Sequence, residues 1–225
     1  MEYLKYLQEE KNSRRSSALL TAATIFLFRG IDEVKMTDIA DECGLGVASI
    51  YRYFGTKTKL LIMVGELLWA DTRVLFDEAA ARPDYAELSG FRQLSVLFSV
   101  YETIFRYHKD FLRFLRDFDA TMLRENVPKT ELSSYERGLF EFFDYFKAAY
   151  DKGTADRSVR SDIDLELFYY SATHMLLSTG QKFIAGAIVE SDDDTRTEAE
   201  IKIMLDMVLT YISPWAGGLP SPDKM

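Results

Sequence analysis

Polar side chains that could hydrogen bond to nucleic acid lie at short intervals between residues 47 and 52. Arg52 carries a planar guanidinium that can donate two parallel hydrogen bonds to guanine O6 and N7, and Ser49 could bond to a base or a phosphate. Val47 and Ala48 could contact a thymine methyl group. Base reading is one expectation for Arg52, and a phosphate contact or a solvated surface charge is the alternative.

Further residues nearby could contact phosphate. Thr37 and Lys57 stand at the starts of two expected helices, where free backbone N–H groups and the helix dipole attract phosphate oxygens. Thr37 either binds phosphate or only caps its helix. We expect Tyr51 to face inward with its hydroxyl at the DNA edge, and Tyr53 to be the better phosphate ligand. Arg14, on the preceding helix, could add a backbone contact or remain a solvated charge.

Apolar residues spaced three and four apart predict helices along nearly the whole chain and no strand, so the expected fold class is all-α. The first helix should end near Arg29 and Gly30, and the second should begin with Thr37 as its cap. A turn at residues 44–46 then leads into a short helix from Val47 to Phe54. Thr56 should cap a long helix that continues to about residue 82.

Three short helices with a glycine-containing turn between the second and third predict a helix-turn-helix. Over roughly residues 13–62 the sequence resembles the N-terminal signature of the TetR family of regulators. Gly46 and Ala48 depart from it, because the family often has serine and glycine there. The residues that carry the resemblance are Met36-Thr37-Asp38-Ile39-Ala40, Cys43-Gly44-Leu45, Ser49-Ile50-Tyr51-Arg52-Tyr53-Phe54-Gly55-Thr56-Lys57 and Leu60-Leu61.

The resemblance implies a three-helix DNA-binding domain over residues 1–62 and a larger helical domain for ligand sensing and dimerisation over residues 63–225. It implies a repressor that binds a palindromic double-stranded operator as a homodimer, through a four-helix bundle made from the last two helices of each subunit. A small hydrophobic or aromatic effector would release the DNA. The alternative is a helical DNA-binding protein without a ligand.

The second part of the chain is rich in aromatic residues at helical spacing, which line either a ligand cavity or an ordinary core. A cavity of a few hundred Å3 would favour the ligand sensor. We expect residues 152–153 to close one helix, Ser161 or Asp162 to cap the next, and Pro214 to stop the last. The candidate ligand-binding residues are Tyr101, Phe105, His108, Phe118, Phe142, Phe146, Tyr170 and His174.

Charge is unevenly distributed along the chain. The net charge of −9 divides into +1 over residues 1–60 and −10 over the remainder, so DNA contact should be confined to the N-terminal part. The single cysteine, Cys43, can form no internal disulfide, and two histidines at no metal spacing predict neither metal nor cofactor. No phosphate loop or nucleophile motif suggests an enzyme. Without a long apolar run or a secretion signal, we expect a cytoplasmic protein with no membrane partner.

Overall fold

The computed structural model describes residues 14–186 and 194–214, and within them the chain folds as nine α-helices and three short 3-10 helices without a strand. The all-α fold class is therefore confirmed. None of the described helices is long and apolar enough to cross a membrane. The first thirteen residues of the expected DNA-binding domain lie outside the described residues.

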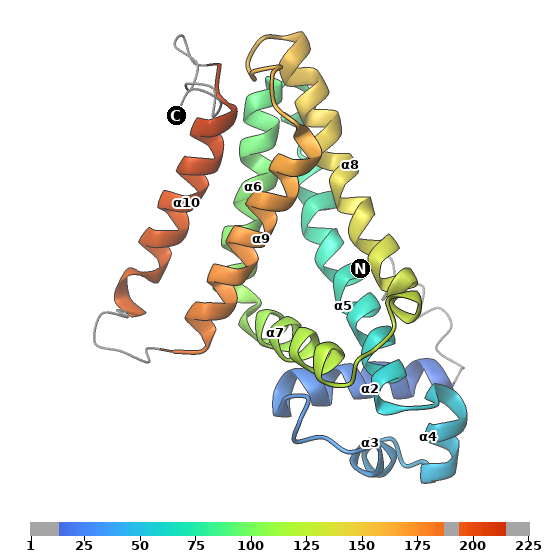
Figure 1. The fold of residues 1–225 in the computed structure, drawn as a ribbon. Helices are drawn as coiled ribbons and strands as arrows, with labels where there is room; N and C mark the ends of the chain where they lie inside the picture. The colour runs from blue at the N-terminus through green and yellow to red at the C-terminus, as the bar shows by residue number, and fades with distance from the viewer. Residues whose placement is uncertain (1–13, 187–193, 215–225) are drawn as a thin grey trace.

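Three helices form the N-terminal unit at one end of the molecule: α2 (Arg14–Arg29), α3 (Met36–Glu42) and α4 (Val47–Phe54) (Figure 1). Their shared core contains fully buried apolar side chains, among them Phe26, Ile39 and Ile50. As expected, α2 stops at Arg29, because Gly30 adopts a φ of +86° that favours glycine. The unit has the arrangement of a helix-turn-helix, with α4 as its third helix.

Helix α5 (Lys57–Ala80) joins this unit to the rest of the molecule. Its N-terminus is capped as predicted, since the Thr56 hydroxyl accepts a hydrogen bond from the Lys59 N–H at 3.1 Å. The helix packs against α2 and α4 near the N-terminal unit and against α6 and α8 in the body. A single rigid element therefore contacts both parts of the chain (Figure 1).

The body consists of α6 (Gly90–Tyr107), α7 (Lys109–Arg124), α8 (Ser133–Ala155), α9 (Leu165–Ile184) and α10 (Thr197–Ile212). Short 3-10 helices at Tyr85–Glu87, Lys129–Leu132 and Asp194–Arg196 connect them. Helix α7 lies at the lower end of the body and packs against α2, whereas α10 lies on the outside against α6 and α9 (Figure 1). Helix α10 ends two residues before Pro214, as expected.

The contact between α6 and α8 depends on two glycines. A Cβ atom on Gly90 would lie 2.0 Å from the backbone nitrogen of Gly153, which no relaxation of a side chain could accommodate. The prediction that residues 152–153 close α8 was wrong, because the helix continues to Ala155. Gly153 is there for close helix packing and not for a helix end.

Two predicted helix caps were also wrong. Helix α3 begins at Met36, so Thr37 lies inside its first turn, and the Asp38 carboxylate accepts the Lys35 N–H at 3.0 Å instead. Helix α9 is capped by Asp164, which accepts the Leu167 N–H at 3.0 Å. Asp162, one of the two expected caps, is paired with Arg160. In both cases an aspartate other than the predicted cap accepts a backbone N–H at the start of the helix.

Candidate nucleic-acid interface and cavity

The outer face of α4 is available to enter a DNA groove. Val47, Ala48 and Arg52 are exposed, and Ser49 is half-buried beside Arg52, whose Nη2 lies 3.4 Å from the Ser49 hydroxyl. The bounds of α4 agree with the predicted Val47–Phe54 helix. One helix fits the major groove. Ala48 and Arg52 project from the side opposite the core, and Val47 is exposed at the N-terminus of the helix.

The expected orientations of the two tyrosines were wrong. Tyr51 is 50% exposed, whereas Tyr53 is half-buried, lies edge-on to Phe54 at 6.1 Å and has its backbone carbonyl bonded by Arg15 Nε at 3.3 Å. The buried side chains of Ile50 and Phe54 define the face of α4 that points to the core. At about 100° per residue, Tyr51 and Tyr53 lie about 80° from the centre of that face, on opposite sides of it. Helix α2 covers the Tyr53 side only. Tyr51 therefore has the freer hydroxyl.

Three other predicted phosphate ligands differ in how accessible they are. Thr37 is exposed in the first turn of α3, and Arg14 is exposed at the start of α2. Lys57 is half-buried, and its ammonium donates a hydrogen bond to the Ile31 carbonyl at 2.5 Å. Burial lowers the pKa of Lys57, while nearby Asp32 opposes that shift. One of the three donors of the Lys57 ammonium is therefore already occupied by the Ile31 carbonyl.

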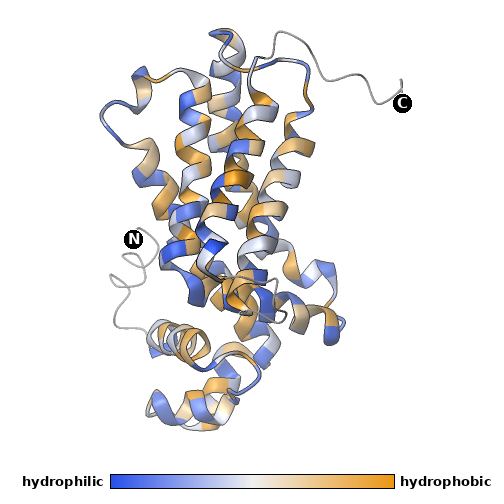
Figure 2. Ribbon diagram, turned by 90° about the vertical axis from the view of Figure 1, so that its left-hand side faces the viewer, coloured by the Kyte–Doolittle hydropathy of each residue, from blue (hydrophilic) through white to orange (hydrophobic). Residues whose placement is uncertain are grey.

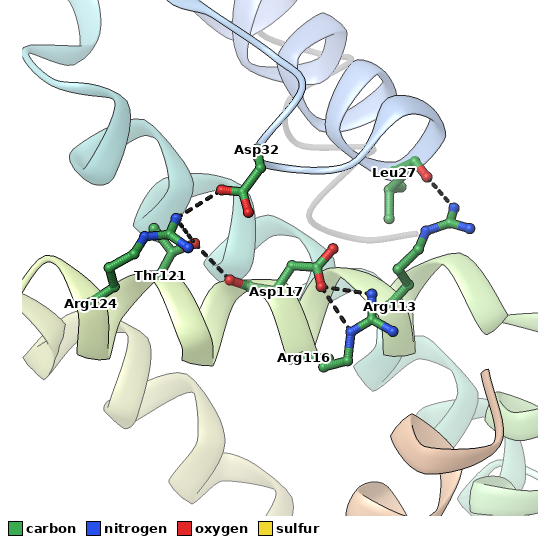
Figure 3. A network of polar contacts seen from close by, with 7 residues as sticks. All are labelled: Leu27, Asp32, Arg113, Arg116, Asp117, Thr121 and Arg124. Atoms are coloured by element: carbon green, nitrogen blue, oxygen red, sulfur yellow. Dashed lines mark hydrogen bonds and ion pairs between the residues drawn. The ribbon is translucent and has the colours of Figure 1, made fainter. Parts of the chain in front are cut away.

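Arginines of α7 hold the N-terminal unit against the body, a feature that the sequence alone did not indicate (Figure 3). Arg113 donates a hydrogen bond to the Leu27 carbonyl at 2.6 Å, in the last turn of α2 where carbonyls lack helical partners. Arg124 forms an ion pair with Asp32, in the loop between α2 and α3, at 2.8 Å. Polar contacts thus fix α7 to the N-terminal unit at two points, one in α2 and one in the loop after it.

A cavity of about 250 Å3 lies in the body between α5, α6, α7, α8 and α9. Its walls are mainly aromatic and aliphatic, with a few polar groups near Asp119 and Gln181. Such a mixture suits a small molecule that is held by apolar contact and oriented by few hydrogen bonds. The lining residues include Trp69, Phe76, Tyr101, Ile104, Leu115, Asp119, Tyr135, Leu139, Phe142, Tyr169, Tyr170, Thr173, His174, Leu177, Ser178 and Gln181.

Four of the eight predicted ligand-binding residues line this cavity, namely Tyr101, Phe142, Tyr170 and His174. The other four lie elsewhere. Phe118 is fully buried and stacks on the ring of Tyr135 at 4.8 Å, and Phe146 packs on Phe98 at 4.7 Å. Phe105 lies edge-on to Phe183, and His108 occupies the junction between α6 and α7. These side chains support the cavity from behind or lie beyond it.

Sequence reasoning missed the most polar part of the cavity wall. Trp69 Nε1 donates a hydrogen bond to the Tyr135 hydroxyl at 2.7 Å, which holds both rings in place. Burial raises the pKa of Tyr135 well above its usual value, and burial also raises the pKa of the Asp119 carboxyl. Asp119 follows the cavity residue Leu115 by one helical turn, the only signal that could have placed it there.

A second hollow lies on the outside of the molecule, between α9 and α10. Its volume is about 470 Å3, and Leu167, Met175, Met207 and Tyr211 are among its lining residues. Leu167 is 66% exposed and Met207 60% exposed, which is unusual for large apolar side chains. Figure 2 shows hydrophobic residues along the helices on this side of the molecule.

An exposed helix-turn-helix joined to a helical body with an internal cavity is the architecture of a DNA-binding transcriptional regulator. Comparisons with known proteins show what the chain is similar to. Residues 18–64 match the family described as bacterial regulatory proteins, tetR family. The HTH-type transcriptional repressor KstR2 of Rhodococcus jostii (strain RHA1) is 29% identical over 163 residues, which cover 71% of this chain and 74% of that protein.

Solved structures have the same fold at low sequence identity. A transcriptional regulator from Saccharomonospora viridis in complex with choline has a TM-score of 0.63 and 16% identity, covering 85% of this chain and 95% of its own. The regulator FadR from Bacillus subtilis in complex with stearoyl-CoA has a TM-score of 0.58 and 14% identity, covering 86% and 96%. Over residues 18–64 the chain thus matches the tetR family, and its fold is shared by solved transcriptional regulators.

Proposed function

We propose that this regulator is a ligand-responsive repressor that binds a palindromic operator as a homodimer and releases it when a small molecule occupies the cavity. The observation that carries the proposal is that α5 and α7 each contact both the helix-turn-helix and the cavity. Leu115 and Asp119 of α7 line the cavity, while Arg113 and Arg124 of the same helix bind α2 and the loop after it.

The N-terminal part, residues 1–62, is assigned to DNA binding. Helix α4 would enter the major groove with Val47, Ala48, Ser49 and Arg52, and Tyr51 would contact the backbone from its exposed position. The net charge of +1 over residues 1–60, against −10 for the remainder, supports contact through this end alone. The second part, residues 63–225, is assigned to sensing and dimerisation.

The apolar hollow between α9 and α10 supports a two-fold dimer. Exposed Leu167, Met207 and Tyr211 would pack against the same residues of a second copy, which gives an isologous four-helix interface. Such a dimer presents two α4 helices to DNA. Half-sites separated by roughly 34–36 Å, one turn of the double helix, or somewhat more would then be read as a palindrome.

Effector release requires two states that differ in how the two α4 helices are spaced. A ligand that binds better to the state with the wrong spacing weakens operator affinity by the difference in binding free energy. The cavity of about 250 Å3 favours a sensor over a ligand-free DNA-binding protein. The choline and stearoyl-CoA complexes of structural neighbours support small-molecule effectors in general, and the KstR2 relative supports repression.

Selection of bound sequences from random DNA tests this function. The full chain should enrich a palindrome, and binding should weaken as salt rises. Arg52→Ala should lose about 1–3 kcal/mol of discrimination at one base pair of each half-site. Lys57→Ala should weaken binding to all sequences alike, since Lys57 is expected to contact phosphate. Arg137→Ala, on α8 in the body, is the matched control and should change neither. Enrichment of no sequence, or equal binding by the Arg52 and Lys57 variants and the parent, would overturn the assignment to α4.

A further inference from the structure

We propose that the cavity of the body takes a small organic cation, an amine or quaternary ammonium with an apolar substituent, recognised by the Asp119 carboxylate and the surrounding aromatic rings. The inference rests on the proposed sensing function and specifies the chemical class of its ligand. It follows from the charge, the walls and the size of the cavity.

The charge of the cavity is negative. Asp119 is the carboxylate among the described lining residues, and neither lysine nor arginine accompanies it there. Its side chain forms no ion pair or hydrogen bond with any other residue in the described part of the chain. Asp119 lies at the solvent-exposed rim of the cavity, where partial desolvation raises the pKa of its carboxyl. A bound cation would compensate the charge of Asp119, whereas a bound anion would be repelled.

A neighbouring hollow between α5 and α8 does not cancel the negative charge of the cavity. It lies on the other side of Trp69, Tyr135 and Phe142 and contains Arg73 and Arg137, together with Glu66 and Glu141. Arg73 is paired with Glu141, so its charge is neutralised locally. That hollow contains as many carboxylates as arginines, so its formal charge is zero, whereas the cavity carries the charge of Asp119 alone.

The walls of the cavity are suited to a cation. A positive charge is attracted to the face of an aromatic ring, most strongly where water is excluded. The Trp69 ring meets Phe142 at 5.4 Å and 67°, and Phe76 meets Phe142 at 5.2 Å and 77°. Rings turned at such angles enclose a space from several directions. The seven aromatic lining residues are Trp69, Phe76, Tyr101, Tyr135, Phe142, Tyr169 and Tyr170.

The volume limits the ligand to a small molecule. At about 250 Å3 the cavity is below the roughly 300–1,000 Å3 that typical ligand pockets span. A single ring or short chain bearing an ammonium group fits this volume. His174, Ser178 and Gln181 remain on the α9 side of the wall to bond a polar group of the same molecule.

Three probes of nearly equal shape test the charge preference by calorimetric titration of the full chain: cationic phenyltrimethylammonium, neutral tert-butylbenzene and anionic benzenesulfonate. A purely apolar cavity prefers the neutral probe, because burying it costs no desolvation of charge. We expect the cation to bind at least about tenfold more tightly than the neutral probe, and the anion to show no binding. Tighter binding of tert-butylbenzene or benzenesulfonate, or binding of none of the three, overturns the proposal.

A carboxylate variant locates the effect. Asp119→Asn should lower the affinity for phenyltrimethylammonium about tenfold and leave that for tert-butylbenzene unchanged. Asp110→Asn is the control, because Asp110 is exposed on the same helix, as Asp119 is, but does not line the cavity. Equal losses in the two variants would show a general charge effect and overturn the assignment to Asp119.

Release of DNA separates this inference from the proposed function. A cation that binds in an Asp119-dependent manner without lowering operator affinity would support the ligand class and overturn the sensing role. A neutral probe that binds more tightly than the cation and releases operator DNA would support the sensing role and overturn the cationic ligand class.

Discussion

Arg124 on α7 and Asp32 in the loop between α2 and α3 form an ion pair at 2.8 Å, across the boundary between the body and the helix-turn-helix (Figure 3). Both side chains are more than half exposed, so the pair contributes little to global stability, about 0–1 kcal/mol. Its importance lies in its position, since it fixes the loop that precedes α3.

We therefore expect Arg124→Ala to change the free energy of unfolding by less than about 1 kcal/mol but to accelerate amide hydrogen exchange in residues 30–35. A double-mutant cycle with Asp32→Ala should return a coupling free energy of the same small size. Lys129→Ala, at an exposed position in the following 3-10 helix, serves as the control. Unchanged exchange in the loop would show that the pair does not hold it.

The close contact of α6 and α8 gives a sharp prediction from two glycine substitutions. Gly90→Ala places a Cβ 2.0 Å from the Gly153 nitrogen and must force the helices apart, at a cost of about 3 kcal/mol or more. Gly138→Ala, within α8, meets no atom within 4 Å and should stabilise the protein by up to about 1 kcal/mol. Chemical denaturation measures both. Equal effects would contradict the assigned packing role of Gly90.

The two tyrosines of α4 should differ in their contribution to DNA binding. Tyr51→Phe removes an exposed hydroxyl and should weaken operator binding severalfold, the equivalent of about 1 kcal/mol, without loss of stability. Tyr53→Phe should have little effect on binding, because the ring packs against the core and α2 covers that side. Fluorescence anisotropy with labelled operator compares them. A larger loss for Tyr53→Phe would restore the orientation first expected.

Asp156 predicts an acid-dependent loss of stability. Hydrogen bonds from the Ser158 hydroxyl and from the backbone N–H groups of Gly90 and Ser158 lower its pKa below the usual 3.8. A carboxyl with a depressed pKa stabilises the fold at pH above its unfolded value, and that contribution is lost as pH falls through the lower folded value.

Asp156→Asn should therefore be less stable than the parent at neutral pH, and the difference should shrink in strongly acidic solution. Urea denaturation at several pH values measures this difference. Asp144→Asn, at an exposed position of the same helix α8, is the control and should show no such trend. A difference that is constant with pH would contradict the role of the carboxylate.

The α9–α10 face predicts how the chain associates. Met207→Lys places a charge at the centre of the apolar hollow and should convert the expected dimer into a monomer, as measured by sedimentation velocity. Leu123→Lys changes a side chain that is 79% exposed on α7, away from this face, and should leave the dimer intact. A monomeric parent, or a Met207→Lys variant that stays dimeric, would contradict the proposed interface.

The helix-turn-helix could be predicted closely from the sequence because local signals agree there. Glycines bracket α4, Ile50 and Phe54 define its inner face, and Thr56 caps the following helix. These signals do not depend on distant residues. The resemblance to the TetR family rests on the same segment, while the all-α fold class followed from helical spacing along nearly the whole chain.

Only four of the eight predicted ligand-binding residues line the cavity, because its walls come from five helices whose packing the sequence does not show. Phe118 and Phe142 both lie on aromatic stripes of helical spacing, and only the neighbouring helices decide that Phe142 faces the cavity while Phe118 stacks on Tyr135. Nothing local in the sequence distinguishes Asp119 from a solvated charge. Gly153 was wrongly predicted to end a helix. A glycine is needed there because Gly90, more than sixty residues away in the sequence, packs directly against it.

The hydrogen bond from Trp69 to Tyr135 has a practical consequence. The indole forms part of the cavity wall, so its emission should respond directly to whatever enters. The chain has two tryptophans, and the other, Trp215, lies outside the described residues. A Trp215→Phe variant would leave Trp69 in the cavity wall as the single tryptophan, and a library of compounds could then be screened by selective tryptophan excitation without knowledge of the operator.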